Sequence, residues 1–321
     1  MRASLHFILT TAGAALLLGS LAASVRADIL YSADFGLGAI QRFTGDGAIT
    51  YSPPHYPWIV GGLGYVGGLA FDSTGILYVS LSDKIEKFSQ MGVDLGPFAN
   101  TGAGALAFDR AGNLYGVTGN NAITKFTPDG VGSVFADASD GLAGPTALAF
   151  DSAENLYVSN YGSSLAERRV IKLSPDGIGS VFASGGLYAP LGIAVDGADN
   201  VYLLDSPAST PSIWKFTLGG VRSLFANVDG EGDAGLAFDG AGNLYYGGGH
   251  LTGFIGKLSP DGVALPFNPQ PVSQPRSFAF TDDNGVPVPL ANQTPAPEPV
   301  TWMLLGLGLA ALLGRSRPRG A

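Results

Sequence analysis

A short motif that recurs at intervals of about 40 residues constrains the fold more than any other feature of this chain. The motif is an apolar residue, alanine, a second apolar residue and aspartate. Its copies lie at 69–72, 106–109, 148–151, 193–196 and 236–239, and a degenerate copy lies at 278–281. Repeats of this length that hold several short strands are typical of β-propeller blades.

Each repeat predicts four strands. The motif itself is apolar on both faces and predicts the innermost strand, with an alanine thin enough for the crowded axis. A turn such as Asp109–Asn113 follows, in which aspartate binds the turn and glycine or asparagine takes a positive φ. The next strand carries a tyrosine, the third reads Ile-x-Lys-Phe, and a Pro-Asp-Gly turn leads to a fourth strand that ends in Phe-Ala.

The two ends of the repeat region complement each other. Residues 28–51 hold strands two, three and four without a first strand, and Phe278-Ala279-Phe280 is a first strand without followers. We expect them to form one composite blade that closes the ring and removes sheet edges. The predicted fold class is therefore all-β, a six-bladed β-propeller at 28–286 with four-stranded blades, plus an N-terminal signal helix and a C-terminal hydrophobic helix.

This pattern resembles the NHL-repeat propellers. The likeness lies in the inner motif, the Gly-Asn-Leu-Tyr segment, the Ile-x-Lys-Phe strand and the Pro-Asp-Gly turn, and it covers about residues 28–283. It implies the fold. It does not imply one function, because this fold hosts lactonases, lyases and binding modules.

The first 27 residues predict a secretory signal peptide. Arg2 makes the start basic, Leu5 to Leu21 is mostly apolar, and small residues precede a cleavage site after Ala27. The alternative is a membrane anchor that is not cleaved.

The C-terminus has three parts after a proline-rich linker at 287–296. Pro297-Glu298-Pro299 comes first, an apolar run at 300–313 predicts a short hydrophobic helix, and a tail at 315–319 carries three arginines. The run is short for a membrane span, and the arginines would stay on the cytoplasmic side. The body of the protein would then lie outside the cytoplasmic membrane.

This tail resembles the PEP-CTERM sorting signal over about 25 residues, with all three parts in order. The resemblance implies processing by an exosortase, after export through signal peptidase, in a Gram-negative bacterium that makes exopolysaccharide. It also implies transient anchoring by the C-terminal helix, followed by display at the cell surface or release. The alternative is a plain tail anchor.

Charge and cysteine content exclude some function classes. The formal net charge is −9, and the two ends hold five of the arginines, so the body is more acidic still. Such a body repels phosphate backbones, so we expect no nucleic-acid partner. The absence of cysteine excludes disulfides, thiol nucleophiles and cysteine-based metal sites.

Three polar residues are candidates for a ligand or metal site at one mouth of the channel. Counting three positions past the tyrosine of each second strand reaches Asp34, Asn160 and Asp205. Carboxylate and amide oxygens suit Ca²⁺ or another divalent cation, and gluconolactonase-like propellers place such an ion there. Leu81 and Gly248 hold equivalent positions and offer no ligand. The alternative is ordinary polar residues at strand ends.

Other repeated or reactive residues predict no chemistry. The motif aspartates are expected to stabilise turns, and the lysines of the third strands to lie at solvated blade edges. His250 follows a second strand and could act as a base, but a surface histidine is favoured. No catalytic residue is therefore assigned.

These observations favour a monomeric, exported binding or scaffold module for protein or polysaccharide over an enzyme. The alternative is a metal-dependent lactonase- or lyase-like enzyme at the channel mouth. A purely structural module is a third hypothesis.

Overall fold

The computed structural model describes residues 28–288 except 46, 49–50, 53–55, 58–60, 120, 208–209, 230–234, 249–252, 268–271 and 283–285. Several of the sequence predictions lie outside the described residues. They are the signal peptide with Ala27, most of the linker, the Pro297-Glu298-Pro299 motif, both predicted terminal helices and His250. No helix in the described ranges is long and apolar enough to cross a membrane.

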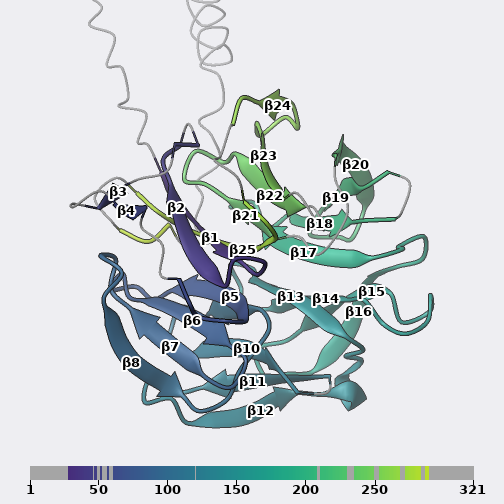
Figure 1. Ribbon diagram of the computed structural model, residues 1–321. Helices are drawn as coiled ribbons and strands as arrows, with labels where there is room; N and C mark the ends of the chain where they lie inside the picture. Colours follow the sequence, from purple (N-terminus) through teal and green to yellow (C-terminus); the bar gives the residue numbers. More distant parts are fainter. Residues whose placement is uncertain are drawn as a thin grey trace, which may run out of the picture.

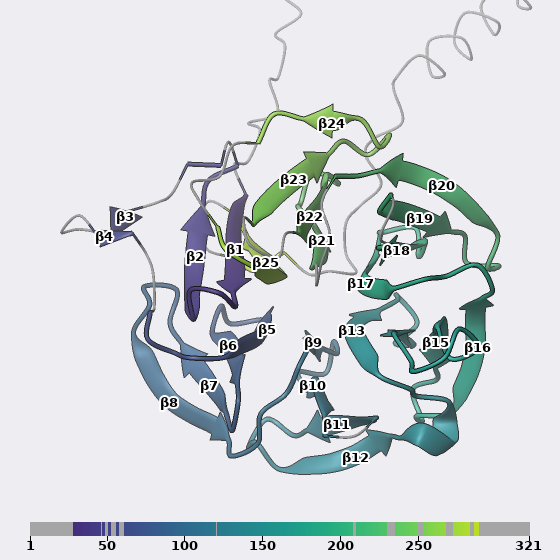
Figure 2. The same ribbon diagram turned by 45° about the vertical axis from the view of Figure 1, so that its right-hand side comes forward.

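Five four-stranded antiparallel sheets and one three-stranded sheet surround a central axis (Figures 1 and 2). Blade 1 contains β5 (Val66–Phe71), β6 (Leu77–Leu81), β7 (Ile85–Phe88) and β8 (Asp94–Ala99). Blade 2 contains β9 (Leu106–Phe108), β10 (Leu114–Thr118), β11 (Ala122–Phe126) and β12 (Gly132–Ala136). Blade 3 contains β13 (Pro145–Phe150), β14 (Leu156–Asn160), β15 (Arg169–Leu173) and β16 (Gly179–Ser184). Blade 4 contains β17 (Pro190–Val195), β18 (Val201–Asp205), β19 (Ser212–Phe216) and β20 (Arg222–Asn227). Blade 5 contains β21 (Leu236–Phe238), β22 (Leu244–Gly248), β23 (Phe254–Leu258) and β24 (Ala264–Leu265). The repeated motif is the inner strand of every blade, and the six-bladed propeller is confirmed.

The sixth blade is the composite one. It contains β25 (Pro275–Thr281), β1 (Ile29–Asp34) and β2 (Ala39–Phe43) in that order from the axis. Leu30 pairs with Phe280 and Ala33 with Ser277, so the C-terminal strand completes the N-terminal sheet as expected.

The predicted fourth strand of this blade differs from the structure. Ile49 and Thr50 lie outside the described residues. Tyr51 belongs to β3 (Tyr51–Ser52), which pairs with β4 (Tyr56–Pro57) in a separate hairpin. Because the partner of Tyr51 is Pro57, this segment adds no strand to the described composite sheet.

Six hydrophobic clusters hold the ring together, one at each interface between neighbouring blades. Aromatic pairs recur in these clusters. The Tyr115 ring meets Phe135 of its own blade and Phe150 of the next blade edge-on, with centroids 4.9 and 5.0 Å apart. The Tyr245–Phe280 pair, 4.9 Å apart, closes the ring between blade 5 and the composite blade. The second apolar residue of the motif is therefore a contact between blades.

The turn after the inner strand is held by the motif aspartate in blades 1 to 5, as predicted. Asp109 accepts hydrogen bonds from the backbone N–H of Asn113 (2.8 Å), its side-chain amide (2.7 Å) and the hydroxyl of Tyr115 (3.2 Å). The same network recurs with Asn200 and Tyr202 around Asp196.

The repeated lysines are not the solvated edge residues that we expected. Lys172 pairs with Asp151 at 3.4 Å and lies over the Tyr157 ring, 5.0 Å from its centroid. Lys257 is only 13% exposed and pairs with Asp239 at 3.6 Å. The prediction was wrong for Lys125, Lys172, Lys215 and Lys257, because the tyrosine of the second strand and the aspartate of the turn give each of these four lysines a site within its own blade.

The antiparallel order gives the central channel two mouths. At the strand-start mouth the inner strands begin and the second strands end. At the strand-end mouth the inner strands end in the aspartate turns. Both described ends of the chain lie at the strand-end mouth, because Ile29 pairs with Thr281 and Val288 donates a backbone hydrogen bond to Phe280 (2.9 Å).

Candidate functional site

A cavity of about 270 Å³ opens at the strand-start mouth. Its lining comes from the beginnings of the inner strands and includes Tyr65, Thr146, Arg276 and Ser277. The Arg276 guanidinium lies 3.8 Å from the centroid of the Phe35 ring, and Phe35 meets Tyr65 edge-on at 5.4 Å. The described lining therefore combines aromatic and hydroxyl groups with one cation.

The hydroxyl groups at this mouth join inner strands to one another. Thr146 Oγ1 lies 2.8 Å from Ser159 Oγ and donates to the carbonyl of Pro190 at 3.0 Å. Ser277 Oγ accepts a hydrogen bond from the backbone N–H of Leu69 at 3.0 Å. No imidazole or carboxylate contributes to this lining within the described part of the chain, so no described lining residue would activate either hydroxyl as a nucleophile.

Glycine at the start of the inner strands allows neighbouring blades to approach closely. A Cβ atom on Gly68 would lie 2.5 Å from the carbonyl oxygen of Gly104, and one on Gly67 would lie 2.8 Å from that of Ala103. These contacts are shorter than any side chain tolerates. Gly67 and Gly68 therefore line the cavity and also allow the backbones of two blades to pack together.

The three predicted site residues lie at the expected end of their strands, but one strand away from the axis. They are the last residues of their strands: Asp34 of β1, Asn160 of β14 and Asp205 of β18. All three are almost completely buried, and they line neither this cavity nor the cavity at the opposite mouth that is described below. Each binds the loop that leads into its own inner strand. Adjacent strands are separated by about 4.8 Å, which is enough to remove these side chains from the channel.

Backbone N–H groups donate hydrogen bonds to the carboxylates of both Asp34 and Asp205. Asp34 accepts hydrogen bonds from Leu37 (3.1 Å), Ser273 (2.6 Å) and Gln274 (3.1 Å). Asp205 accepts from Tyr188 (2.9 Å) and Ala189 (2.6 Å). The two carboxylates therefore fix the loops that precede β25 and β17.

Asn160 has one open acceptor. Its side-chain amide donates to the carbonyl of Gly141 at 2.8 Å, and its Oδ1 is buried without a partner. A single neutral oxygen does not hold Ca²⁺, which takes 6–8 oxygen ligands. No group of three or more His, Cys, Asp or Glu side chains in the described ranges could hold a metal ion. Asp34, Asn160 and Asp205 thus do not fit the predicted divalent cation.

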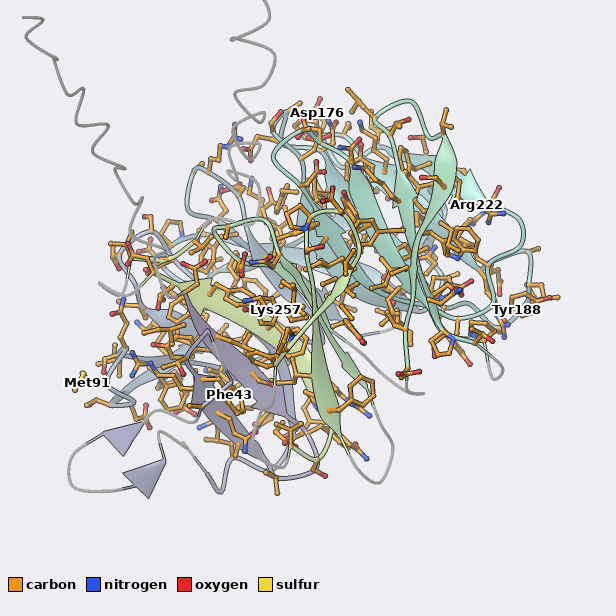
Figure 3. The ribbon with its side chains drawn as sticks, turned by 90° about the horizontal axis from the view of Figure 1, so that it is seen from above. Phe43, Met91, Asp176, Tyr188, Arg222 and Lys257 are labelled. Carbon is orange, nitrogen blue, oxygen red and sulfur yellow. The ribbon has the colours of Figure 1, made fainter. Side chains whose placement is uncertain are left out.

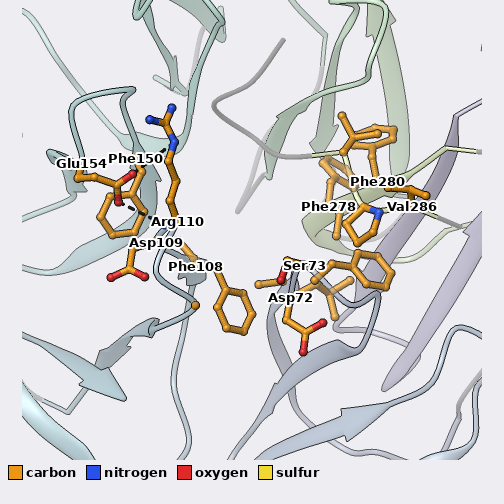
Figure 4. A pocket seen from close by; sticks show the side chains of 18 of the residues that line it. Asp72, Ser73, Phe108, Asp109, Arg110, Phe150, Glu154, Phe278, Phe280 and Val286 are labelled. Carbon is orange, nitrogen blue, oxygen red and sulfur yellow. Dashed lines mark hydrogen bonds and ion pairs between the residues drawn. The ribbon is translucent and has the colours of Figure 1, made fainter. Parts of the chain in front are cut away.

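A larger cavity of about 400 Å³ opens at the opposite, strand-end mouth (Figure 4). Its apolar walls include Phe71, Phe108, Phe150 and Phe280 of four inner strands. The segment Val286–Val288, which follows the last strand, lines it as well. The sequence prediction did not include this site. The motif phenylalanines were a signal for it, because they end the inner strands at this mouth.

The polar rim of this cavity links neighbouring blades. Arg110 pairs with Glu154, with Nε 3.4 Å from Oε1, and donates to the carbonyl of Ser152 at 2.8 Å. Figure 4 shows Arg110, Phe150 and Glu154 across the cavity from Phe278, Phe280 and Val286.

Several solved structures are similar to this one at low sequence identity. Virginiamycin B lyase from Staphylococcus aureus has a TM-score of 0.54 at 15% identity, over 79% of this chain and 88% of that one. A gluconolactonase from Xanthomonas campestris has a TM-score of 0.56 at 19% identity, over 78% and 88%. A chain of a nidogen/laminin complex has a TM-score of 0.59 at 15% identity, over 84% and 100%.

No family model and no curated protein matches the sequence. At these identities the structural likeness shows the fold alone. The three neighbours include enzymes and a protein found in a complex, so the fold is compatible with both classes of function.

Proposed function

We propose that this protein is an exported surface or extracellular-matrix protein whose propeller binds a protein or polysaccharide at the strand-start mouth. The observation that carries the proposal is the position of the described chain ends. Ile29 and Val288 both lie at the strand-end mouth. A tether that continues from Val288 leaves the opposite mouth facing away from its anchor.

The lining of the strand-start cavity supports binding. Tyr65 is 38% exposed at its rim, and aromatic faces stack on sugar rings and peptide side chains. Thr146 and Ser277 are committed to bonds between strands, which gives a rigid surface. Rigid recognition surfaces lose little entropy on binding.

The binding role is tested with the full chain and the extracellular polysaccharide of the producing cell. Tyr65→Ala is expected to weaken retention on that polysaccharide by about tenfold, in the range for loss of an aromatic anchor. Tyr188→Ala is the matched control, because Tyr188 is exposed, lines neither cavity and lies at the periphery of the molecule (Figure 3). Equal retention of wild type and Tyr65→Ala would reject this binding surface.

The sorting role rests on Pro297-Glu298-Pro299, the apolar run and the arginine tail. Deletion of 300–321, or replacement of Glu298 by Gln, is expected to change the processing and the release of the protein from cells. Immunoblots of membrane, surface and medium fractions measure the distribution. An unchanged distribution in both variants would show that no exosortase acts on this tail.

A lactonase or lyase is the second candidate, favoured by the two enzyme propellers among the similar structures. The strand-start mouth is where such chemistry would take place here, with His250 of the loop after β22 as the candidate base. Turnover of lactone substrates or of virginiamycin B that is lost in His250→Ala would establish it. No turnover, with or without divalent ions, would leave the binding role.

A further inference from the structure

Asp72 differs from the other four motif aspartates because it has neither an asparagine side chain nor a lysine as a partner among the described residues. In blades 2 to 5 the side-chain amide of the turn asparagine donates a hydrogen bond to the motif aspartate. A lysine of the third strand also pairs with that carboxylate. In blade 1, Ile76 occupies the asparagine position and cannot donate from its side chain. The Asp–Lys pairs of the other blades measure between 3.4 and 3.9 Å. No such ion pair joins Asp72 to Lys87 within the part of the chain that the structure describes.

Among the described residues, the donors to the Asp72 carboxylate are all neutral. Its Oδ1 accepts hydrogen bonds from the backbone N–H of Thr74 (2.9 Å), the Thr74 hydroxyl (2.7 Å) and the backbone N–H of Ile76 (3.0 Å). The carboxylate also hydrogen bonds to Tyr78, and burial together with this anion raises the pKa of Tyr78 to about 12. Tyr78 therefore remains a neutral donor at physiological pH.

Asp72 lines the cavity at the strand-end mouth, where the other charges are balanced. Lys125 pairs with Asp109 at 3.7 Å, and Lys172 pairs with Asp151 at 3.4 Å. Arg110 and Glu154 pair with each other at 3.4 Å. One negative charge therefore remains without a cation among the described lining residues.

The rest of the cavity is apolar and aromatic. Phe71 and Phe108 are partly exposed, and they stand on the two inner strands next to Asp72. Figure 4 shows Asp72 and Phe108 below Phe278 and Phe280, with the Asp72 carboxylate turned toward its own turn. A volume of about 400 Å³ falls within the range of small-molecule sites, about 300–1,000 Å³.

We propose that the cavity at the strand-end mouth binds a small organic monocation, an ammonium group on an apolar body, with Asp72 as its counter-ion and the phenylalanines as its walls. An ammonium group supplies the charge-assisted hydrogen bonds that the turn of blade 1 does not supply to Asp72. The phenylalanine faces attract the same cation and bury the apolar body. This site is independent of the binding role assigned to the opposite mouth.

The test uses three probes of one shape, 4-phenylbutylamine, 4-phenylbutanol and 4-phenylbutyrate, titrated calorimetrically into the full chain. The amine is expected to bind saturably, and the alcohol and the carboxylate to bind at least about tenfold more weakly. Asp72→Asn is expected to lower the affinity for the amine by about 10- to 100-fold, the range for a charge-assisted hydrogen bond. It should leave the affinity for the alcohol unchanged.

Asp196→Asn is the matched control, since it makes the same change at the equivalent turn position, and Asp196 does not line the cavity. Val286→Lys is a second variant for the case that Asp72→Asn does not fold. Val286 is 58% exposed at the cavity, so a lysine there is tolerated and should weaken binding of the amine by like-charge repulsion. The proposal is overturned if the alcohol binds as tightly as the amine, if neither variant changes the affinity for the amine, or if no amine binding saturates.

Discussion

Glu154 and Asp199 occupy the left-handed position that glycine holds in the equivalent turns of blades 1, 2 and 5. Their φ angles are 63° and 60°, against 83° at Gly112. This conformation costs a residue with a side chain roughly 1–2 kcal/mol. Each of the two side chains reaches the preceding blade, where Glu154 pairs with Arg110 and Asp199 accepts from the backbone N–H of Ser152 at 2.7 Å. The backbone cost is thus linked to a bond between blades.

Substitutions at Asp199 separate these two effects. Asp199→Ala loses the bonds to Ser152 and keeps the strained backbone, whereas Asp199→Gly loses the bonds and relieves the strain. Asp199→Gly is expected to be more stable than Asp199→Ala by about 1 kcal/mol, measured by urea unfolding.

Gly112→Ala is the control for strain alone, because a Cβ there meets no atom within 4 Å. It should cost about 1 kcal/mol. Equal stability of the two Asp199 variants would show that this turn is not strained.

Asp205 makes a residue-scale prediction about pH. Burial raises the pKa of this carboxyl above its ordinary range, although the amides of Ala189 and Tyr188 lower it in part. The folded state therefore holds the proton to a higher pH than the unfolded state. The contribution of Asp205 to stability is greatest below the unfolded pKa of about 3.9 and is lost as the pH rises through the folded pKa.

Asp205→Asn should accordingly flatten the fall in unfolding free energy as the pH rises above about 4. Denaturant unfolding of wild type and variant at several pH values measures this difference. Asp28, whose pKa is also raised by burial, keeps a residual slope in both proteins. A steeper slope in the variant would contradict the assignment.

The inner strands are the elements that make six sheets into one ring. Each carries an aromatic or branched residue into the cluster shared with the neighbouring blade, and β25 does so from the far end of the chain. Phe280 is 2% exposed and packs against Tyr245 of blade 5. Closure therefore depends on side-chain packing as well as on the β1–β25 ladder.

Phe280→Ala is expected to destabilise the propeller by about 3–5 kcal/mol, the range for a fully buried phenylalanine. Phe108→Ala is the comparison, because Phe108 holds the equivalent place in blade 2 but is only partly buried, and it should cost less. Thermal and urea unfolding measure both variants. A smaller loss at Phe280 than at Phe108 would show that the composite blade contributes little to closure.

At the scale of the whole molecule, the two mouths differ in their relation to the chain ends. The strand-end mouth holds both described ends, and the strand-start mouth holds none. If the C-terminal tail anchors the protein as proposed, the propeller stands with its strand-end mouth toward the membrane.

Single cysteines test this orientation, because the natural chain has none. In intact cells, a bulky polyethylene-glycol maleimide is expected to label Ser163→Cys, in the loop after β14, faster than Ser73→Cys in the strand-end turn. Both residues are exposed, so the released protein should label equally at both. Equal labelling of the anchored protein rejects the orientation, and the absence of any anchored fraction rejects the sorting role itself.

The sequence alone determined the six-bladed ring, its composite closure and the aspartate turns. The strands and turns follow from local periodicity, and the ring and its closure follow from a motif that repeats and from the strands missing at its two ends. The sequence placed Asp34, Asn160 and Asp205 at the ends of their second strands, as the structure has them, but it did not show that they lie one strand away from the channel. Only the tertiary structure decided that backbone amides bind the carboxylates of Asp34 and Asp205 and that four of the repeated lysines lie over the tyrosine of their own blade. It also decided that, among the five motif aspartates, Asp72 is the one without a lysine partner in the described structure, because hydrogen-bond partners and charge balance depend on how the side chains pack.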